Sequence, residues 1–295
     1  MNGLLLVDKP AGVTSHSVVS KIRQLTGISR VGHLGTLDPF ATGLLPVMIG
    51  GANRLADQMM GGNKAYEFDV QFGQQTTTLD PTGEIMAEMT VPKNLGALIE
   101  SKLPHFMGKI SQVPPVYSAL KVQGRPMYEH MRSSGKLPID IEEKRRDIHI
   151  YGISVLQILS ESRVKMGVFC GKGTYVRCLA RDLAIAIGTV GHCVALRRTF
   201  VEPWYVNHAL TLESLTLDSI EKNLLPLDKL LPKTPYVTLV NHYSQLANGN
   251  IFSVTESLNL QNGLCLISGG DQIYLCEAVM QETGFFQIRP QKKLN

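Results

Sequence analysis

Cysteine is scarce in this sequence, and the spacing of the cysteines is not that of a disulfide framework or a zinc site. The five cysteines, at positions 170, 178, 193, 265 and 276, are odd in number, and no two of them form a Cys-x-x-Cys pair. Small disulfide-bonded domains and zinc knuckles depend on even, closely paired sets, so both classes are disfavoured. We therefore expect buried thiols in a reducing compartment.

Long apolar runs are also missing. No window approaches the roughly 18 uninterrupted apolar residues that a membrane-spanning helix requires. The first ten residues hold one short apolar run, with no basic residue before it and with Asp8 and Pro10 after it. That pattern predicts a first β-strand and not a signal peptide. We expect a cytoplasmic protein without a membrane segment.

A large excess of one charge is absent as well, because 29 basic and 25 acidic side chains give a net charge of +4. From Pro235 onward there are three basic and four acidic side chains, so the preceding 234 residues carry 26 and 21. This larger part is therefore compatible with a polyanionic partner. The cations of the first 65 residues are candidate phosphate contacts: Lys9, Lys21, Arg23, Arg30, Arg54 and Lys64.

Two stretches have the apolar spacing of amphipathic helices. Thr14 and Ser15 precede the first, and Gly27 follows its last apolar residue, which predicts a capped helix between them. The second stretch, 175–187, carries apolar residues at i, i+3, i+4 and i+7, and Gly188 follows it.

Two other stretches alternate as strands do. The segments 66–72 and 164–170 place apolar side chains at every second position, which predicts half-buried strands. Three prolines then fall between positions 226 and 235, and short β-like runs follow them. We expect a larger domain over residues 1–233 and a small all-β module over residues 234–295.

The segment 32–47 has the most unusual chemistry of the chain. Two glycines flank His33, and Asp38 precedes a proline that favours an extended backbone at the aspartate. The small residues around it allow another part of the chain to approach closely. Such a carboxylate can serve as a nucleophile or general base, or it can be part of an ordinary Asx-type turn. The same Thr-Leu-Asp-Pro sequence recurs around Asp80 without the flanking glycines, and there we expect a hairpin turn.

This segment resembles the signature of the TruB family of pseudouridine synthases, and three further blocks agree with the family. They are Val7-Asp8-Lys9-Pro10 with Gly12, Thr14 and Ser15; Pro114-Pro115 with Tyr117-Ser118-Ala119, Lys121, Gly124 and Tyr128; and Gly173-Thr174-Tyr175-Val176-Arg177 with Ala195-Leu196-Arg197-Arg198-Thr199. The four blocks keep the family's order and span most of residues 3–200. The departures are minor, with Leu34 in place of the usual threonine, Phe40 in place of the common leucine and Gly171 in place of serine or cysteine.

The resemblance implies a fold and an activity. The fold is α+β, with a mixed, largely antiparallel sheet flanked by helices and a small C-terminal PUA-like RNA-binding module. The activity is isomerisation of uridine to pseudouridine in the T-loop of tRNA, at position 55. The reaction has no net redox change, and it implies neither a cofactor nor a metal. The partner is the T-arm stem-loop, and the enzyme is a monomer without an obligate protein partner.

The resemblance also assigns the site. It implies that Asp38 is the catalytic carboxylate and that Tyr66 stacks on the extruded uracil. Tyr175 and Leu196 are implied to contact the substrate nucleotide, and His33 to fill the space that the base vacates. Each assignment has a structural alternative: Tyr66, Tyr175 and Leu196 suit a core equally well, and His33 suits an ordinary loop.

Arg177 is implied to be the partner of the catalytic carboxylate, and its position supports this independently. It falls in the first turn of the second predicted helix, where the helix dipole disfavours a cation, and it lies off the apolar stripe. A nearby carboxylate would explain both facts, and a solvated surface arginine is the alternative. An adjacent guanidinium lowers the pKa of an aspartate and offsets much of the opposite effect of burial.

Two other function classes remain open at this point. A non-catalytic RNA-binding or tRNA-folding protein could use the same scaffold, but such a protein would have no need of a buried carboxylate facing RNA phosphates. An aspartate-dependent hydrolase would require a second carboxylate or a metal cluster, and the sequence shows neither.

Overall fold

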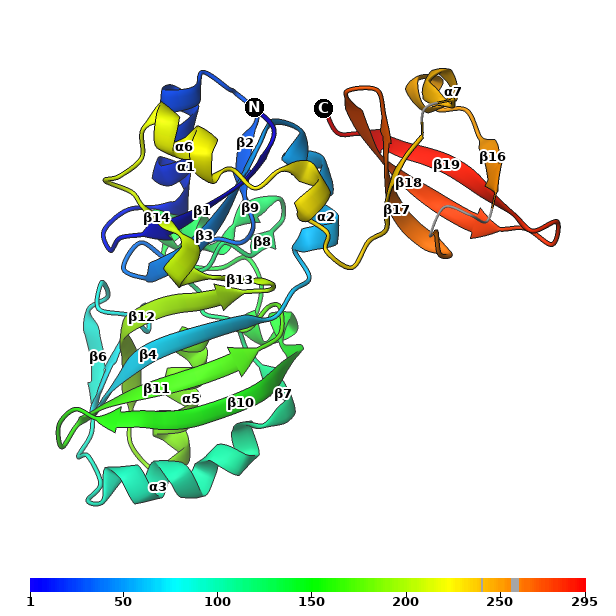
Figure 1. Ribbon diagram of the computed structural model, residues 1–295. Coiled ribbons are helices and arrows are strands. Elements are labelled where there is room, and N and C mark those ends of the chain that lie inside the picture. The colour runs from blue at the N-terminus through cyan, green and yellow to red at the C-terminus, as the bar shows by residue number, and fades with distance from the viewer. Residues whose placement is uncertain (240, 256–259) are drawn as a thin grey trace.

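The computed structural model describes residues 1–239, 241–255 and 260–295. Its larger sheet has ten strands, and a separate five-stranded sheet follows it in the chain (Figure 1). The strands of the large sheet are β1 (Gly3–Lys9), β2 (Val31–His33), β3 (Thr42–Ile49), β4 (Lys64–Phe72), β7 (Gly108–Gln112), β10 (Arg146–Ile158), β11 (Arg163–Cys170), β12 (Gly191–Val201), β13 (Trp204–Tyr205) and β14 (Leu210–Thr211). Their order is β14-β1-β3-β12-β4-β11-β10-β7, with β2 paired to β3 and β13 to β12.

The sheet is mixed and largely antiparallel, as expected. Among the described strands, β1 pairs with β14 and β3 with β12 in parallel, and the other pairs are antiparallel. Strand β12 lies between β3 and β4, which are neighbours in the sequence. It therefore brings residues near position 196 beside both of them, and this arrangement builds the site.

Helices and two small hairpins surround the large sheet. The helices are α1 (Ser15–Thr26), α2 (Ala56–Met59), α3 (Leu95–Lys102), α4 (Met127–Ser134), α5 (Val176–Ala186) and α6 (Leu217–Asn223). The hairpins are β5 (Gln74–Thr76) with β6 (Ile85–Glu88), and β8 (Lys121–Val122) with β9 (Arg125–Pro126). Helices α1, α3 and α5 contribute apolar side chains to one core beneath the sheet. None of the helices in the described part of the chain is long and apolar enough to cross a membrane.

Both predicted helices form. The Thr14 hydroxyl accepts a hydrogen bond from the Ser17 amide at 2.9 Å, and Gly27 ends α1 in the left-handed conformation with φ +69°. Helix α5 is one residue shorter at each end than predicted, because Tyr175 is its N-cap and Ile187 its C-cap. The two predicted strands correspond to β4 and β11.

Strand β1 contributes to two cores. Its side chains point alternately to opposite faces of the sheet, so Leu5 and Val7 join the core between the sheet and helices α1, α3 and α5. Leu4 and Leu6 join a second core on the other face, which includes Leu294 from the end of the chain. Because both faces are covered, β1 is apolar from Gly3 to Val7.

The second core is completed by the C-terminal sheet, which is consistent with a PUA-like module. Its elements are β15 (Tyr236–Thr238), α7 (Tyr243–Asn248), β16 (Phe252–Thr255), β17 (Gly263–Gly269), β18 (Gln272–Met280) and β19 (Phe285–Lys293), and its strand order is β15-β17-β18-β19-β16. Leu266 and Leu275 of this sheet pack with residues of β1 and β3.

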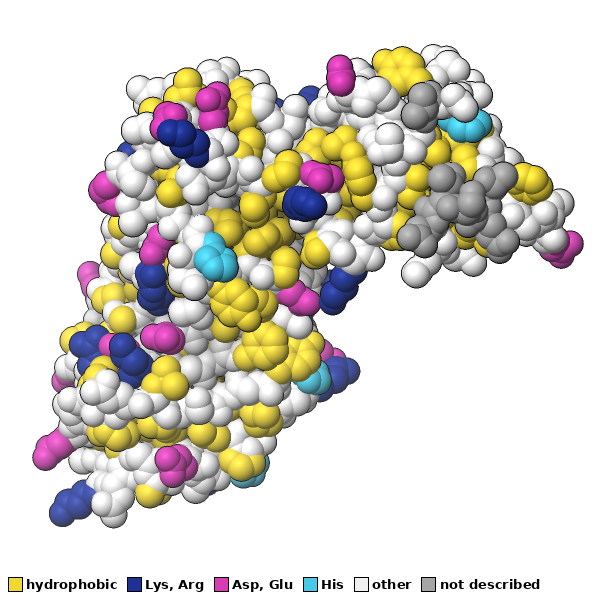
Figure 2. Space-filling view, in the orientation of Figure 1, with side chains coloured by type: hydrophobic (Ala, Val, Ile, Leu, Met, Phe, Trp, Pro, Cys, Tyr) yellow, Lys and Arg dark blue, Asp and Glu magenta, His cyan; other side chains and the backbone are white. Residues whose placement is uncertain are grey.

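Strands β10 to β13 carry a row of aromatic side chains at the surface. The rings of Tyr151, Phe169, Phe200 and Tyr205 contact one another in turn, with centroids 5.4, 6.2 and 4.6 Å apart. Figure 2 shows hydrophobic side chains gathered over this part of the molecule, below the C-terminal sheet.

Candidate active site

Asp38 lies in the loop between β2 and β3, and the first residues of the chain hold this loop in place. The buried Ser15 hydroxyl accepts a hydrogen bond from the Leu37 amide at 2.9 Å. The Gly12 amide and the Lys9 ammonium both donate to the Pro39 carbonyl, at 2.8 and 3.3 Å. The loop is therefore fixed immediately before and immediately after the aspartate.

Gly43, after the loop, allows β3 to approach β12. It has a φ of +103°, and a Cβ atom here would come within 2.3 Å of the Arg198 carbonyl oxygen. Arg198 itself is 1% exposed, and its guanidinium donates to the Leu44 carbonyl at 2.7 Å and to the Gly35 carbonyl at 3.1 Å. The close approach expected for this segment is confirmed, and it attaches the Asp38 loop to the central strand.

A pocket of about 370 Å³ opens beside Asp38. Its volume falls in the range of small-molecule sites, at roughly 300–1,000 Å³. The lining residues are Gly35, Thr36, Leu37, Asp38, Lys64, Tyr66, Ser118, Ala119, Leu120, Arg146, Gly171, Gly173, Thr174, Tyr175, Val176, Arg177, Leu196 and Arg198. Of the six site residues predicted from the sequence, five line this pocket and His33 does not.

Arg177 contacts the carboxylate as predicted. The arginine is 3% exposed; its Nε lies 2.9 Å from Oδ2 of Asp38, and its Nη2 donates to Oδ1 at 3.3 Å. The Nε contact is an ion pair and not a hydrogen bond. The same guanidinium also donates to the carbonyls of Thr78 and Tyr117, both at 2.8 Å. The alternative of a solvated surface arginine is therefore wrong.

The second Thr-Leu-Asp-Pro segment also reaches this arginine. Asp80 lies in the expected hairpin turn, between β5 and β6, and its Oδ1 accepts hydrogen bonds from the Thr78 and Thr82 hydroxyls, both at 2.6 Å. Its other oxygen, Oδ2, lies 3.1 Å from Nη1 of Arg177. Sequence reasoning recognised the turn but missed this contact. The one available signal was the repeated tetrapeptide itself.

Burial dominates the electrostatics of Asp38. It raises the pKa of this carboxyl above the ordinary value of 3.8, and the neighbouring charge of Asp80 adds to the rise. The positive charges of Arg177 and Lys9 and the hydrogen bond from Arg177 lower the pKa, but the net direction is upward. Because a third of the side chain remains open to the pocket, a ligand can reach the carboxylate.

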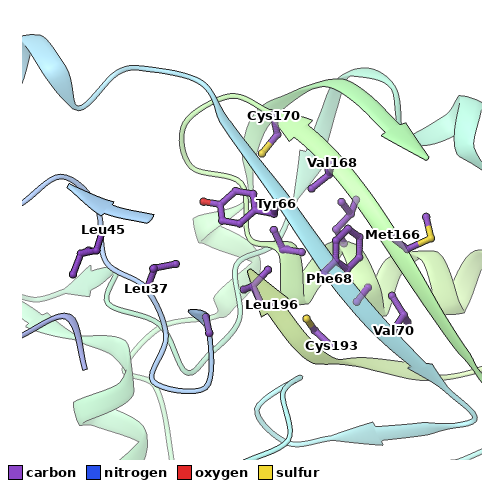
Figure 3. Packing of buried hydrophobic residues seen from close by; sticks show 14 of the residues in the cluster. Leu37, Leu45, Tyr66, Phe68, Val70, Met166, Val168, Cys170, Cys193 and Leu196 are labelled. Carbon is purple, nitrogen blue, oxygen red and sulfur yellow. The ribbon is translucent and has the colours of Figure 1, made fainter. Parts of the chain in front are cut away.

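Tyr66 and Leu196 form an apolar wall next to the carboxylate. Figure 3 shows the Tyr66 ring on the side of β4 that faces Leu37 and Leu45, with Leu196 of β12 beside it. Tyr66 is 9% exposed and Leu196 8% exposed, so each contributes both to the core and to the pocket. Burial raises the pKa of the Tyr66 hydroxyl, which keeps the ring neutral.

These features match one protein family. The model described as "TruB family pseudouridylate synthase (N terminal domain)" matches residues 23–176. The chain is also similar to proteins named tRNA pseudouridine synthase B. The relative from Staphylococcus aureus is 34% identical, with 100% of this chain and 99% of the relative covered. The relative from Neisseria meningitidis is 40% identical, over 83% of this chain and 78% of its own.

The chain belongs to the TruB family of pseudouridine synthases. A third relative, from Psychrobacter cryohalolentis, is 39% identical, and the match spans 77% of this chain but only 64% of that protein's length. Among solved structures, a chain of "Crystal Structure of a Cbf5-Nop10-Gar1 Complex" aligns over 99% of this chain and 85% of its own, with a TM-score of 0.69 and 25% identity. That likeness supports the pseudouridine synthase fold.

His33 lies outside the pocket lining of this TruB-family chain. It is the last residue of β2, it is half-buried, and its Nδ1 atom is buried without a hydrogen-bond partner. Burial lowers its pKa below 6.5, and the nearby charges of Arg198 and His16 act in the same direction. These influences favour the neutral imidazole. Its expected role of filling the space left by the base remains a prediction.

Lys9 differs from its sequence-based expectation as a phosphate contact. It is completely buried, and its ammonium donates to the carbonyls of Pro10, Val13 and Pro39. Burial, as the largest influence, lowers its pKa from 10.5 to about 8. A side chain in this position cannot touch RNA, so that expectation is wrong. Within the described residues, no group of three or more His, Cys, Asp or Glu side chains gathers as a metal site would require.

Proposed function

We propose that this chain converts uridine to pseudouridine in the T-loop of tRNA, at position 55, with Asp38 as the catalytic carboxylate. The observation that carries the proposal is a partly accessible carboxylate, paired with a buried arginine, at the wall of a nucleoside-sized pocket. We infer that the enzyme acts in the cytoplasm as a single polypeptide. We further propose that residues 1–233 catalyse the reaction and that residues 234–295 form an RNA-binding module.

The chemistry needs an ionised carboxylate directed at the ribose. The C1′–N1 bond breaks, the uracil turns, and a C1′–C5 bond forms, while C5 loses its proton and N1 gains one. Asp38 can act as a nucleophile at C1′ or as a base that leads to a glycal, and both routes require the same charged oxygen. Arg177 stabilises that charge in a site where burial opposes it.

The target base must first leave the folded loop. Extrusion costs a few kcal/mol, which contacts in the pocket have to supply. In the proposal, Tyr66 stacks on the base, and Leu196 and Tyr175 contact the nucleotide; all three line the pocket. Lys64 also lines the pocket, and in the proposal its ammonium contacts a phosphate.

The decisive experiment compares two aspartate variants. Asp38→Asn should abolish tritium release from 5-tritiated uridine in a T-arm stem-loop, and RNA affinity should stay within about threefold because the fold and the stacking wall remain. Asp69→Asn is the matched control, since Asp69 is a buried carboxylate that also pairs with an arginine, Arg163 at 2.8 Å, but lies outside the pocket. Turnover by Asp38→Asn comparable to that of the control would refute the assignment. That result would favour the alternative that the chain is a non-catalytic RNA-binding protein.

A further inference from the structure

Tyr175 lines the pocket from the N-cap of α5, the residue before the helix begins. It is the N-cap residue, with φ −102° and ψ 108°, and its side chain accepts no capping hydrogen bond. Serine, threonine, aspartate and asparagine usually occupy this position because their side chains satisfy the free amides of the first turn. The helix that presents Arg177 therefore begins at a residue whose position must be set from elsewhere.

Gln112 supplies that support from a distant part of the chain. It is the last residue of β7 and is 2% exposed. Its Oε1 accepts a hydrogen bond from the Tyr175 amide at 2.8 Å, and its Nε2 donates to the Tyr175 carbonyl at 3.1 Å. One side-chain amide thus binds both backbone groups of one residue, which fixes that residue in position and in orientation.

Arg146 holds the same residue by its ring. It is the first residue of β10 and lies directly opposite Gln112 in the pairing of β7 with β10. Its guanidinium lies 4.7 Å from the centroid of the Tyr175 ring, and its Nη2 donates to the Gly173 carbonyl at 2.7 Å. Gln112 and Arg146, which pair across the two strands, therefore both bind the Gly173–Tyr175 segment. Both contact its backbone, and Arg146 also contacts the Tyr175 ring.

We propose that Gln112 and Arg146 are positioning residues of this site, and that they act by holding Tyr175 as a wall of the pocket. The inference rests on the proposed function, because the positioned ring matters only if a nucleotide enters the pocket. Misplacement of a contact by about 1 Å can slow a reaction by 10²-fold, so a fixed ring contributes to rate more than to affinity.

The first test removes the amide and keeps the length of the side chain. Gln112→Met should lower the single-turnover rate of tritium release from the stem-loop by about 10- to 100-fold, with less than a threefold change in RNA Kd. The matched control is Gln71→Met. Gln71 also uses its amide within the sheet, donating to the Phe72 carbonyl and the Ser162 hydroxyl, both at 3.0 Å, but it lies outside the pocket. The control should lose thermal stability without losing rate.

The second test asks whether the effect passes through the tyrosine. In a Tyr175→Ala background the wall is already absent, so adding Gln112→Met should change the rate by less than about twofold. Arg146→Lys should slow the reaction as well, because lysine keeps the charge but loses the planar contact with the ring.

Several results would overturn the proposal. A Gln112→Met rate equal to that of Gln71→Met, or multiplicative effects of Gln112→Met and Tyr175→Ala, would show that Gln112 does not act through the ring. A fully active Arg146→Lys enzyme with an unchanged salt dependence of RNA binding would show that Arg146 supplies charge alone. If the wild-type protein itself releases no tritium, the proposed function fails, and this inference fails with it.

Discussion

Asp38 and Asp80 bind the same guanidinium: Nε of Arg177 lies 2.9 Å from the first carboxylate and Nη1 lies 3.1 Å from the second. The two aspartates differ in access, because the side chain of Asp38 is 33% exposed and that of Asp80 is 8% exposed. Asp80 also has its own hydroxyl donors from Thr78 and Thr82. Asp80 is thus suited to anchoring the arginine, while the more exposed Asp38 remains accessible from the pocket.

Asp80→Asn should therefore change both rate and pH profile. The variant loses the anchor of Arg177, and we expect single-turnover tritium release to slow by about tenfold or more. Because the charge of Asp80 raises the pKa of Asp38, its removal should move the acid limb of the rate profile to lower pH. Asp182→Asn is the control, since Asp182 pairs with Arg181 on the same helix but outside the pocket. An acid limb that stays in place or moves upward would contradict this account of the pair.

The raised pKa of Asp38 has a consequence for stability. A carboxyl whose pKa is higher in the folded than in the unfolded protein favours folding while it is protonated, and this contribution is lost as the pH rises through the folded-state pKa. At pH 7.5 the neutral Asp38→Asn variant should therefore unfold at a higher temperature than the wild type. The difference should shrink as the pH is lowered toward 4. A variant that is less stable at pH 7.5 would show that the ion pair with Arg177 outweighs burial.

Lys9 provides a test of loop positioning without RNA contact. Lys9→Met removes a donor from three carbonyls, of which the Pro39 carbonyl keeps the Gly12 amide, and should lower the free energy of unfolding by about 1–3 kcal/mol. It should also slow tritium release, because the Pro39 carbonyl next to Asp38 loses its tie to β1. The slope of RNA affinity against salt should stay unchanged, whereas Arg30→Gln, at an exposed cation, should reduce it if Arg30 contacts a phosphate. A reduced slope for Lys9→Met would contradict the burial of its ammonium.

Replacing Gly51 by alanine tests the contact between Gly51 and Leu294 near the end of the chain. A Cβ atom at Gly51 would come within 1.4 Å of the Leu294 carbonyl oxygen, so Gly51→Ala should displace the C-terminal residues and expose the second core. We expect a loss of about 2–4 kcal/mol in urea unfolding, comparable to deleting a buried leucine side chain. Gly61→Ala is the control, because nothing lies within 4 Å of that position. Equal stability of the two variants would refute this contact.

Local features of the fold were predictable from the sequence. The ends of α1 were predictable from Thr14 and Gly27. The Thr14 hydroxyl caps the first turn of the helix, and the left-handed conformation of Gly27 ends its last turn. The strand containing Tyr66 follows from strict alternation. The carboxylate partner of Arg177 was predictable for a local reason too, since a cation in the first turn of a helix requires compensation.

Other features depend on segments that meet only in the folded chain. The buried ammonium of Lys9 donates hydrogen bonds to carbonyls from two separate loops. No local sequence pattern indicates that these two loops lie side by side in the fold. The same holds for Asp80, whose distance from Arg177 depends on where the β5–β6 hairpin lies. The insertion of β12 between β3 and β4 could not be predicted from local patterns either, because it pairs Arg197 with Thr42 and Leu196 with Phe68, which are far apart in the sequence.

The two termini meet at one point of this molecule. The Gly51 amide donates to Oδ1 of Asn2 at 2.7 Å, and the same glycine packs against the Leu294 carbonyl (Figure 1). A short linker could therefore join the ends, and the chain could be reopened in the exposed turn between β10 and β11, far along the sheet from the pocket. Such a circularly permuted protein should retain its catalytic loop, since no covalent link near Asp38 would be broken.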